Sequence, residues 1–134
     1  MKLLLDTHVF LWVTSAEVNL PSKVQKLLEA EENQLLISSA SIWETVIKVS
    51  SRRMEEWDYT TDLGVLEDWI RDLGAEMLPI RTKHAIAISK LRDWSHKDPF
   101  DRMLAAQAIS EGAVLVTADA AFQSLADLRC VWNS

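Results

Sequence analysis

The sequence predicts an α/β fold in which helices cover both faces of a central, mostly parallel sheet, a three-layer α/β/α sandwich. Short apolar runs alternate with amphipathic helical segments along the whole chain, as in parallel sheets whose strands are connected by helices. The 134 residues fit one domain, residues 1–134, which can bury about two thirds of its unfolded surface. Hydrophobic residues make up 49% of the chain and charged residues 25%, a globular composition.

The first half of the chain contains two predicted strands and four predicted helices. In order, these are a strand over residues 2–5, a helix from Thr7, a helix over 21–32, a strand over 35–37, and helices over 38–50 and 61–73. The strands are short apolar runs, whereas the helices carry apolar side chains three and four positions apart. Ser41 and Glu44 fit a capping box, and Gly74 suits a helix end.

The second half continues the alternation. Its predicted elements are a strand over residues 77–80, helices over 82–91 and 98–112, a strand over 113–117, a short helix over 120–125 and an edge strand over 129–132. Asp98 precedes Pro99, which suits the first helical position, so Asp98 can accept hydrogen bonds from the exposed N–H groups of the first turn. A buried stripe is expected at Phe100, Met103, Leu104, Ala108 and Ile109.

The charge distribution argues against a protein that binds nucleic acid through a generally basic surface, because the net charge is −6. Residues 55–76 carry eight acids against one arginine, whereas residues 81–102 carry six basic residues against three acids. A local basic rim therefore surrounds Asp98 and Asp101.

A single cysteine, Cys130, excludes an internal disulfide and a zinc site built on several cysteines. Its place in an apolar run predicts a buried thiol in a reducing compartment. The apolar run before the first acid is only three residues long, Leu3 to Leu5, too short for a signal peptide or a membrane span. We therefore expect a cytoplasmic protein.

Acidic residues follow several of the predicted strands. Asp6 follows the first strand, Glu44 is expected in the first turn after the second, and Asp119 follows the strand over residues 113–117. Because parallel strands end at one edge of a sheet, these acids are expected to meet there, joined by Asp98 and Asp101 if their helix begins beside that edge. Taken singly, each acid also has a structural explanation, as a helix cap, a capping-box partner or, for Glu44, an ion pair one turn along the helix.

Grouped carboxylates of this kind predict a metal site. Two carboxylates about 5 Å apart repel by roughly 3 kcal/mol at an effective dielectric near 20, so a group of them needs protons or a cation. Oxygen donors without cysteine favour magnesium (Mg²⁺), with manganese (Mn²⁺) as the alternative, over zinc. Metal-assisted hydrolysis of a phosphodiester is the reaction that such a site favours.

Four motifs, in this order and spacing, resemble the PIN-domain toxins of VapC type. They are Leu4-Leu5-Asp6-Thr7-His8-Val9-Phe10-Leu11-Trp12, Ser41-Ile42-Trp43-Glu44, the run from His96 to Ala108, and Leu115-Val116-Thr117-Ala118-Asp119 with Phe122. The resemblance implies a PIN-like fold and a magnesium-dependent endoribonuclease that cleaves structured RNA. It also implies a VapB-type antitoxin as partner and a homodimer.

The resemblance also implies roles for particular residues. Asp6, Glu44, Asp101 and Asp119 match the acidic quartet of the family, with Asp6 and Asp101 expected as direct metal ligands. Asp98 is expected as a cap or an outer residue of the site. Thr117 is expected to orient water or a ligand.

Basic and aromatic residues near the acids are candidates for contact with RNA. The basic candidates are His96, Lys97, Arg102, Lys90 and Arg92. His8 is expected at a helix start or in the core. Among the tryptophans, the helical spacing assigns Trp12, Trp43 and Trp69 to the core, whereas Trp57 and Trp94 are candidates for exposed contacts.

Two other functions fit parts of the sequence. A phosphatase or phosphoacceptor domain would use Asp6 as its nucleophile, but it typically needs a lysine after a late strand, and none follows Val131. A binding module without catalysis would use the acids only as caps and an apolar groove for a partner helix.

Overall fold

The computed structural model describes residues 1–15 and 18–133. The sheet contains β1 (Lys2–Leu5), β2 (Gln34–Ser38), β3 (Glu76–Leu78), β4 (Val114–Val116) and β5 (Cys130–Val131). The α-helices are α1 (Thr7–Val13), α2 (Ser22–Glu29), α3 (Ser39–Ser50), α4 (Val65–Leu73), α5 (Thr82–Ala87) and α6 (Pro99–Glu111), and two 3₁₀ helices cover Ile88–Leu91 (η1) and Ala120–Ser124 (η2).

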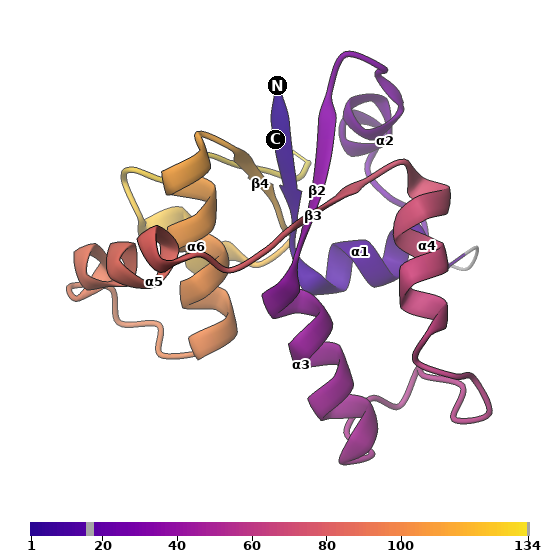
Figure 1. Cartoon of the computed structure of the whole chain (residues 1–134). Helices are drawn as coiled ribbons and strands as arrows, with labels where there is room; N and C mark the ends of the chain where they lie inside the picture. The colour runs from indigo at the N-terminus through magenta and orange to yellow at the C-terminus, as the bar shows by residue number, and fades with distance from the viewer. Residues whose placement is uncertain (16–17, 134) are drawn as a thin grey trace.

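The five strands form one parallel sheet in the order β3-β2-β1-β4-β5. Alternate side chains of each inner strand enter opposite layers of the core. In β1, Leu3 and Leu5 pack into one apolar cluster and Leu4 into the other. Figure 1 shows α1, α2 and α4 on one side of the sheet and α5 and α6 on the other. The predicted α/β class and the three layers are therefore confirmed.

The strand order changes direction between β1 and β4. The chain runs outward from β1 to β2 and β3, and then crosses to β4 on the other side of β1. Such a reversal leaves a crevice at the carboxyl ends of the two strands, because their following segments diverge to opposite sides. Leu5 pairs with Val116 in the register, so both strands end at the same level.

Helix α6 is buried through its middle. The buried stripe that the sequence predicted for this helix is only partly confirmed. Leu104 and Ala108 are buried as expected, but Phe100, Met103 and Ile109 are only half-buried. The buried residues are instead the continuous run Leu104, Ala105, Ala106, Gln107 and Ala108. Small alanine side chains let the helix pack closely against several neighbours at once, and α6 contacts α5, α3, η1 and the sheet.

Side-chain hydrogen bonds change the start of two predicted helices. Helix α4 begins at Val65 rather than near residue 61, because Asp58 and Asp62 bind backbone N–H groups two residues ahead and favour turns. Helix α3 is capped by Ser38, whose hydroxyl accepts from the N–H of Ala40, so the predicted capping box at Ser41 is wrong. Ser41 lies inside the helix and accepts from the Thr7 hydroxyl.

The predicted helices over residues 82–91 and 120–125 also differ from the structure. The first is α-helical to Ala87 and continues as the 3₁₀ helix η1, and the second is the 3₁₀ helix η2 throughout. Among the described residues, no helix has both the length and the apolar character needed to cross a membrane.

The tryptophan predictions are largely wrong. Trp57 and Trp94, expected to be exposed, are only 8% and 5% exposed, whereas Trp43, expected in the core, is 59% exposed. Trp94 is buried in the apolar cluster that includes Leu91 and Phe122, and its indole N–H is satisfied there by the Ala121 carbonyl and the Ser124 hydroxyl. The thiol of Cys130 is half-buried rather than buried, because β5 is the edge strand.

Candidate active site

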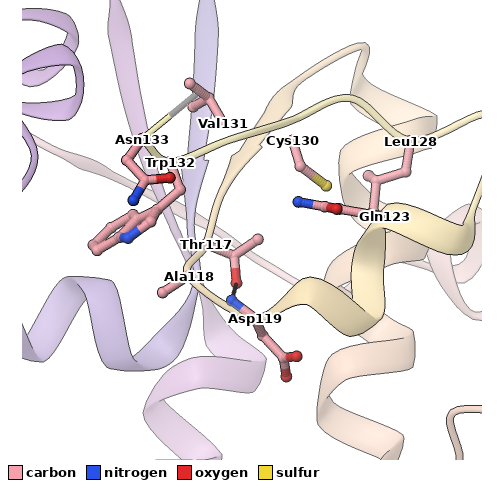
Figure 2. A pocket seen from close by; sticks show the side chains of 9 residues that line it. All are labelled: Thr117, Ala118, Asp119, Gln123, Leu128, Cys130, Val131, Trp132 and Asn133. Atoms are coloured by element: carbon pink, nitrogen blue, oxygen red, sulfur yellow. Dashed lines mark hydrogen bonds between the residues drawn. The ribbon is translucent and has the colours of Figure 1, made fainter.

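Asp6 and Thr117 lie side by side at the carboxyl ends of β1 and β4. The Thr117 hydroxyl donates to Asp6 Oδ2 at 2.7 Å. The same hydroxyl accepts from the backbone N–H of Asp119 at 3.0 Å, the bond that Figure 2 shows. Asp6 is 7% exposed and Thr117 is 4% exposed. The hydroxyl of Thr117 therefore fixes the Asp6 carboxylate relative to the segment that carries Asp119.

Glu44 comes from α3, which begins immediately after β2. Its side chain is buried, and its carboxylate accepts from Lys48 Nζ at 2.9 Å, one helical turn on. This is the ion pair that the spacing of four residues allows. Lys48 therefore partly neutralises Glu44 inside the site.

Asp98 and Asp101 have different partners at the start of α6. Asp98 Oδ1 accepts from the backbone N–H groups of Phe100 at 2.9 Å and Asp101 at 3.1 Å, so Asp98 is the N-cap. Asp101 instead directs Oδ2 to His96 Nε2 at 2.7 Å. For this bond to form with ionised Asp101, His96 Nε2 must carry a hydrogen, so the imidazole orients the carboxylate.

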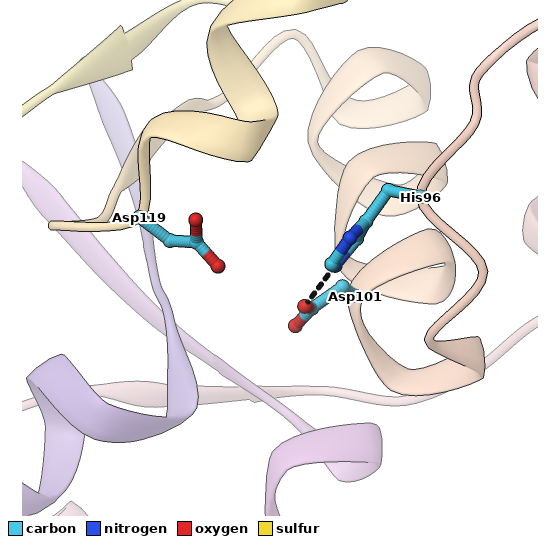
Figure 3. Close-up of side chains that lie close together, drawn as sticks. All are labelled: His96, Asp101 and Asp119. Atoms are coloured by element: carbon cyan, nitrogen blue, oxygen red, sulfur yellow. Dashed lines mark hydrogen bonds and ion pairs between the residues drawn. The ribbon is translucent and has the colours of Figure 1, made fainter.

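Asp119 is exposed and begins the 3₁₀ helix η2. Its Oδ1 accepts from the N–H of Ala121 at 2.9 Å. Figure 3 shows its carboxylate facing the Asp101–His96 pair across a gap. One ligand atom from each of Asp119, Asp101 and His96 lies within 4.8 Å of the others.

These elements enclose an acidic pocket of about 360 Å³. Its lining includes the five carboxylates of Asp6, Glu44, Asp98, Asp101 and Asp119. The expected meeting of the acids at one edge of the sheet is therefore found in the structure.

Burial and mutual repulsion change the protonation of two of these acids. Burial raises the pKa of Asp101 to about 6, and the hydrogen bond with His96 opposes this rise. The nearby charges of Asp98, Asp6 and Glu44 are part of the same rise, each contributing less than burial. Burial also raises the pKa of Asp6, against the hydrogen bond from Thr117. A cation in the pocket would relieve this cost, and carboxylate oxygens are the donors that Mg²⁺ and Mn²⁺ prefer.

The basic residues near the site have different positions. Lys90, Arg92 and Lys97 are exposed, and none of them lines the acidic pocket. The guanidinium of Arg102 donates to three backbone carbonyls, those of Leu91, Trp94 and His96. Arg102 therefore holds the segment that carries His96.

Lys48, His8 and Trp12 also line the acidic pocket, although the sequence did not identify them as site residues. His8 stands in the first turn of α1 and is exposed, which agrees with a helix start and not with the core. Trp12 lies one turn later and its ring packs on that of His8, with 5.9 Å between centroids. His8 lies two residues after Asp6, and Trp12 lies four residues after His8. This spacing was the sequence signal that could have identified His8 and Trp12 as residues of the site.

Comparison with known proteins gives one family match. The model of the family described as "PIN domain" matches residues 3–128. The comparison with curated proteins gave no significant match.

Several solved structures share the fold. A Rickettsia felis VapBC2 structure bound to a promoter DNA fragment has 21% identity and a TM-score of 0.73, covering 99% of this chain and 100% of that one. A DNA-bound VapBC structure from Salmonella typhimurium has 23% identity and a TM-score of 0.74, covering 98% of this chain and 97% of that one. VapBC-5 from Mycobacterium tuberculosis has 18% identity and a TM-score of 0.60, covering 98% of each chain.

Proposed function

The chain belongs to the PIN domain family, and from this premise we propose that it is the toxin of a type II toxin–antitoxin pair, a magnesium-dependent endoribonuclease that cleaves structured RNA. The observation that carries the proposal is the acidic pocket, in which five carboxylates from four separate parts of the chain meet at the carboxyl edge of the sheet. The similar solved structures are VapBC complexes, which supports the toxin–antitoxin part of the proposal.

The site residues divide by what their side chains contact. Asp6 and Asp101 are the proposed direct ligands of the metal, and Glu44 and Asp119 complete the quartet. When bound, Mg²⁺ or Mn²⁺ would supply positive charge that stabilises the anionic phosphodiester in the transition state and would acidify water.

The remaining residues position this quartet. The Thr117 hydroxyl orients Asp6, and the imidazole of His96 orients Asp101. Asp98 uses one carboxylate oxygen to cap α6 and borders the pocket from that position. Lys90, Arg92 and Lys97 are exposed, so each is available for contact with RNA phosphates. For Arg102, the three bonds to carbonyls favour a positioning role, with RNA contact limited to its remaining donors.

A VapB-type antitoxin is the proposed protein partner. A pocket of about 700 Å³ lies along α3 and α4, and its lining is mainly apolar, with Ile42, Trp43, Leu66, Ile70 and Met77. Trp43 and Met77 are 59% and 42% exposed, and an exposed apolar patch of this kind is typical of a protein interface. We also propose that the toxin forms a homodimer and acts in the cytoplasm.

Cleavage of RNA by the purified protein tests the proposal. Wild type should cleave structured RNA with Mg²⁺ and lose the activity with a chelator, whereas Asp6→Asn and Asp101→Asn should lose it under both conditions. Asp127→Asn is the control, because Asp127 is exposed and outside the pocket. Equal cleavage by wild type and the two pocket variants would refute the assignment of the quartet.

Metal binding is measured separately, from the thermal stability of the protein with and without Mn²⁺. Preferential binding to the folded state should raise the Tm of wild type, and Asp101→Asn should abolish the rise. A Tm rise without RNA cleavage would favour a binding module. Phosphorylated Asp6, found by mass spectrometry, would favour the phosphoacceptor function.

A further inference from the structure

A second pocket, whose lining Figure 2 shows, has a volume of about 370 Å³ and adjoins the acidic pocket. We call it the Trp132 pocket, because Trp132 lines it together with Gln123 and Asn133. Ala118 and Asp119 line both pockets, so the two cavities share a wall at the end of β4. A ligand that reaches from one to the other crosses only this short segment.

An aromatic pair connects the two pockets. Trp132 lines the Trp132 pocket and Trp12 lines the acidic pocket, and their rings pack on each other with 5.8 Å between centroids. Both side chains are half-buried against the apolar core. Trp132 therefore offers a ring that is already held in place, which lowers the entropic cost of stacking a planar ligand on it.

The other lining groups favour a neutral, hydrogen-bonding ligand. Gln123 and Asn133 are exposed, and among the hydrogen bonds found within residues 1–15 and 18–133 neither side-chain amide takes part in one. Each amide offers both a donor and an acceptor. Burial raises the pKa of the Cys130 thiol, which keeps it uncharged. Of the described residues that line the pocket, Asp119 is the only charged one, and no lysine or arginine is among them to bind a phosphate.

We propose that the Trp132 pocket binds an unpaired nucleobase of the RNA, next to the nucleotide whose phosphate enters the acidic pocket. The base stacks on Trp132, and the amides of Gln123 and Asn133 contact its polar edge, so the pocket sets the preferred base beside the cut. Unpaired bases in the loops of structured RNA expose both the ring face and the edge that such a pocket needs. This inference rests on the proposed nuclease function.

The test compares variants of Trp132 on a structured RNA whose unpaired loop carries a random sequence. Trp132→Leu removes the stacking surface and should raise the KM for cleavage on the order of tenfold, with a smaller change in kcat. Trp132→Phe keeps an aromatic face and should retain most of the affinity. Mapping of the cut ends should show that Gln123→Ala and Asn133→Ala weaken the base preference beside the cut. Both side chains are exposed, so these variants test the pocket even if Trp132→Leu does not fold.

Trp69→Leu is the matched control. Trp69 is also half-buried and also packs on a second tryptophan, Trp57, with 5.8 Å between centroids, but it lies on α4 and lines neither pocket. Trp69→Leu should therefore leave KM and the cut pattern unchanged. An equal rise of KM in Trp69→Leu and Trp132→Leu would overturn the proposal, because it would indicate general destabilisation.

Two further outcomes separate this proposal from the proposed function. If Mn²⁺ stabilises every variant and wild type cleaves RNA, but the Trp132, Gln123 and Asn133 variants keep the KM and cut pattern of wild type, the nucleobase site alone is refuted. If wild type neither cleaves RNA nor gains stability with Mn²⁺, the nuclease function is refuted and the nucleobase site with it.

Discussion

Replacing Asp101 by asparagine should make the metal-free protein more stable at neutral pH. Burial raises the pKa of Asp101 from 3.8 to about 6, so the folded state binds a proton that the unfolded state has already released. The contribution of this carboxyl to stability is full below its unfolded pKa and is lost as the pH rises through 6. At pH 7.5 the ionised carboxylate therefore costs free energy, which an amide does not.

The magnitude follows from the pKa of about 6 in the folded state against 3.8, at roughly 1.4 kcal/mol for each tenfold change in proton affinity. Its side chain is 17% exposed, and solvent screening reduces the effect, so we expect a gain of about 1–2 kcal/mol for Asp101→Asn. The amide oxygen can still accept from His96, so this hydrogen bond remains available. The expected rise in Tm is about 3–8 °C.

Thermal unfolding in chelator at several pH values measures this difference. The advantage of Asp101→Asn should be present at pH 7.5 and disappear near pH 4, where the wild-type carboxyl is protonated. Asp127→Asn, at an exposed position, should stay within about 0.5 kcal/mol of wild type. A less stable Asp101→Asn protein at pH 7.5, or a difference independent of pH, would refute the reasoning.

Three further predictions concern the support of the site and the core. Arg102→Met removes three hydrogen bonds to buried or half-buried segments and should lower the free energy of unfolding in urea by about 2–4 kcal/mol. Arg102→Lys should restore only part of this stability. An unchanged free energy of unfolding in Arg102→Met would mean that water replaces the guanidinium. Leu104→Ala, at a fully buried position, should cost about 2–5 kcal/mol in the same assay, and a smaller cost would mean that the core collapses around the cavity. Hydrogen bonds from His84 and Lys83 lower the pKa of Glu111 to about 2, so its contribution to stability is present above pH 4.5 and is lost as the pH falls toward 2. Glu111→Gln should weaken this acid dependence of the Tm, and an unchanged profile would contradict it.

Local chemistry made several features predictable from the sequence. The cap at Asp98 needs only Asp98, Pro99 and the first turn of one helix, and the structure confirms it. The Glu44–Lys48 ion pair needs only a spacing of four on a helix. The α/β class follows from the alternation of apolar runs and amphipathic segments, because each segment can bury its apolar side only against another layer.

The tryptophans could not be predicted in the same way. Helical spacing indicates which side chains share a face, but not which face another element covers. Trp43 shares a helix with buried residues and is nevertheless 59% exposed, whereas Trp94 lies outside the helices and is buried by its contacts with η2. Burial depends on distant segments, which the local pattern does not contain.

For Asp101, local sequence determined one property of the side chain and tertiary packing determined another. The sequence by itself determined that Asp101 lies in the first turn of a helix, because Asp98 and Pro99 start that helix three residues earlier. Only the tertiary structure decided that its carboxylate faces Asp119 and shares a pocket with Asp6. The physical reason is the pairing of β1 with β4, which joins Asp6 and Thr117 by a hydrogen bond although they stand 111 positions apart in the chain.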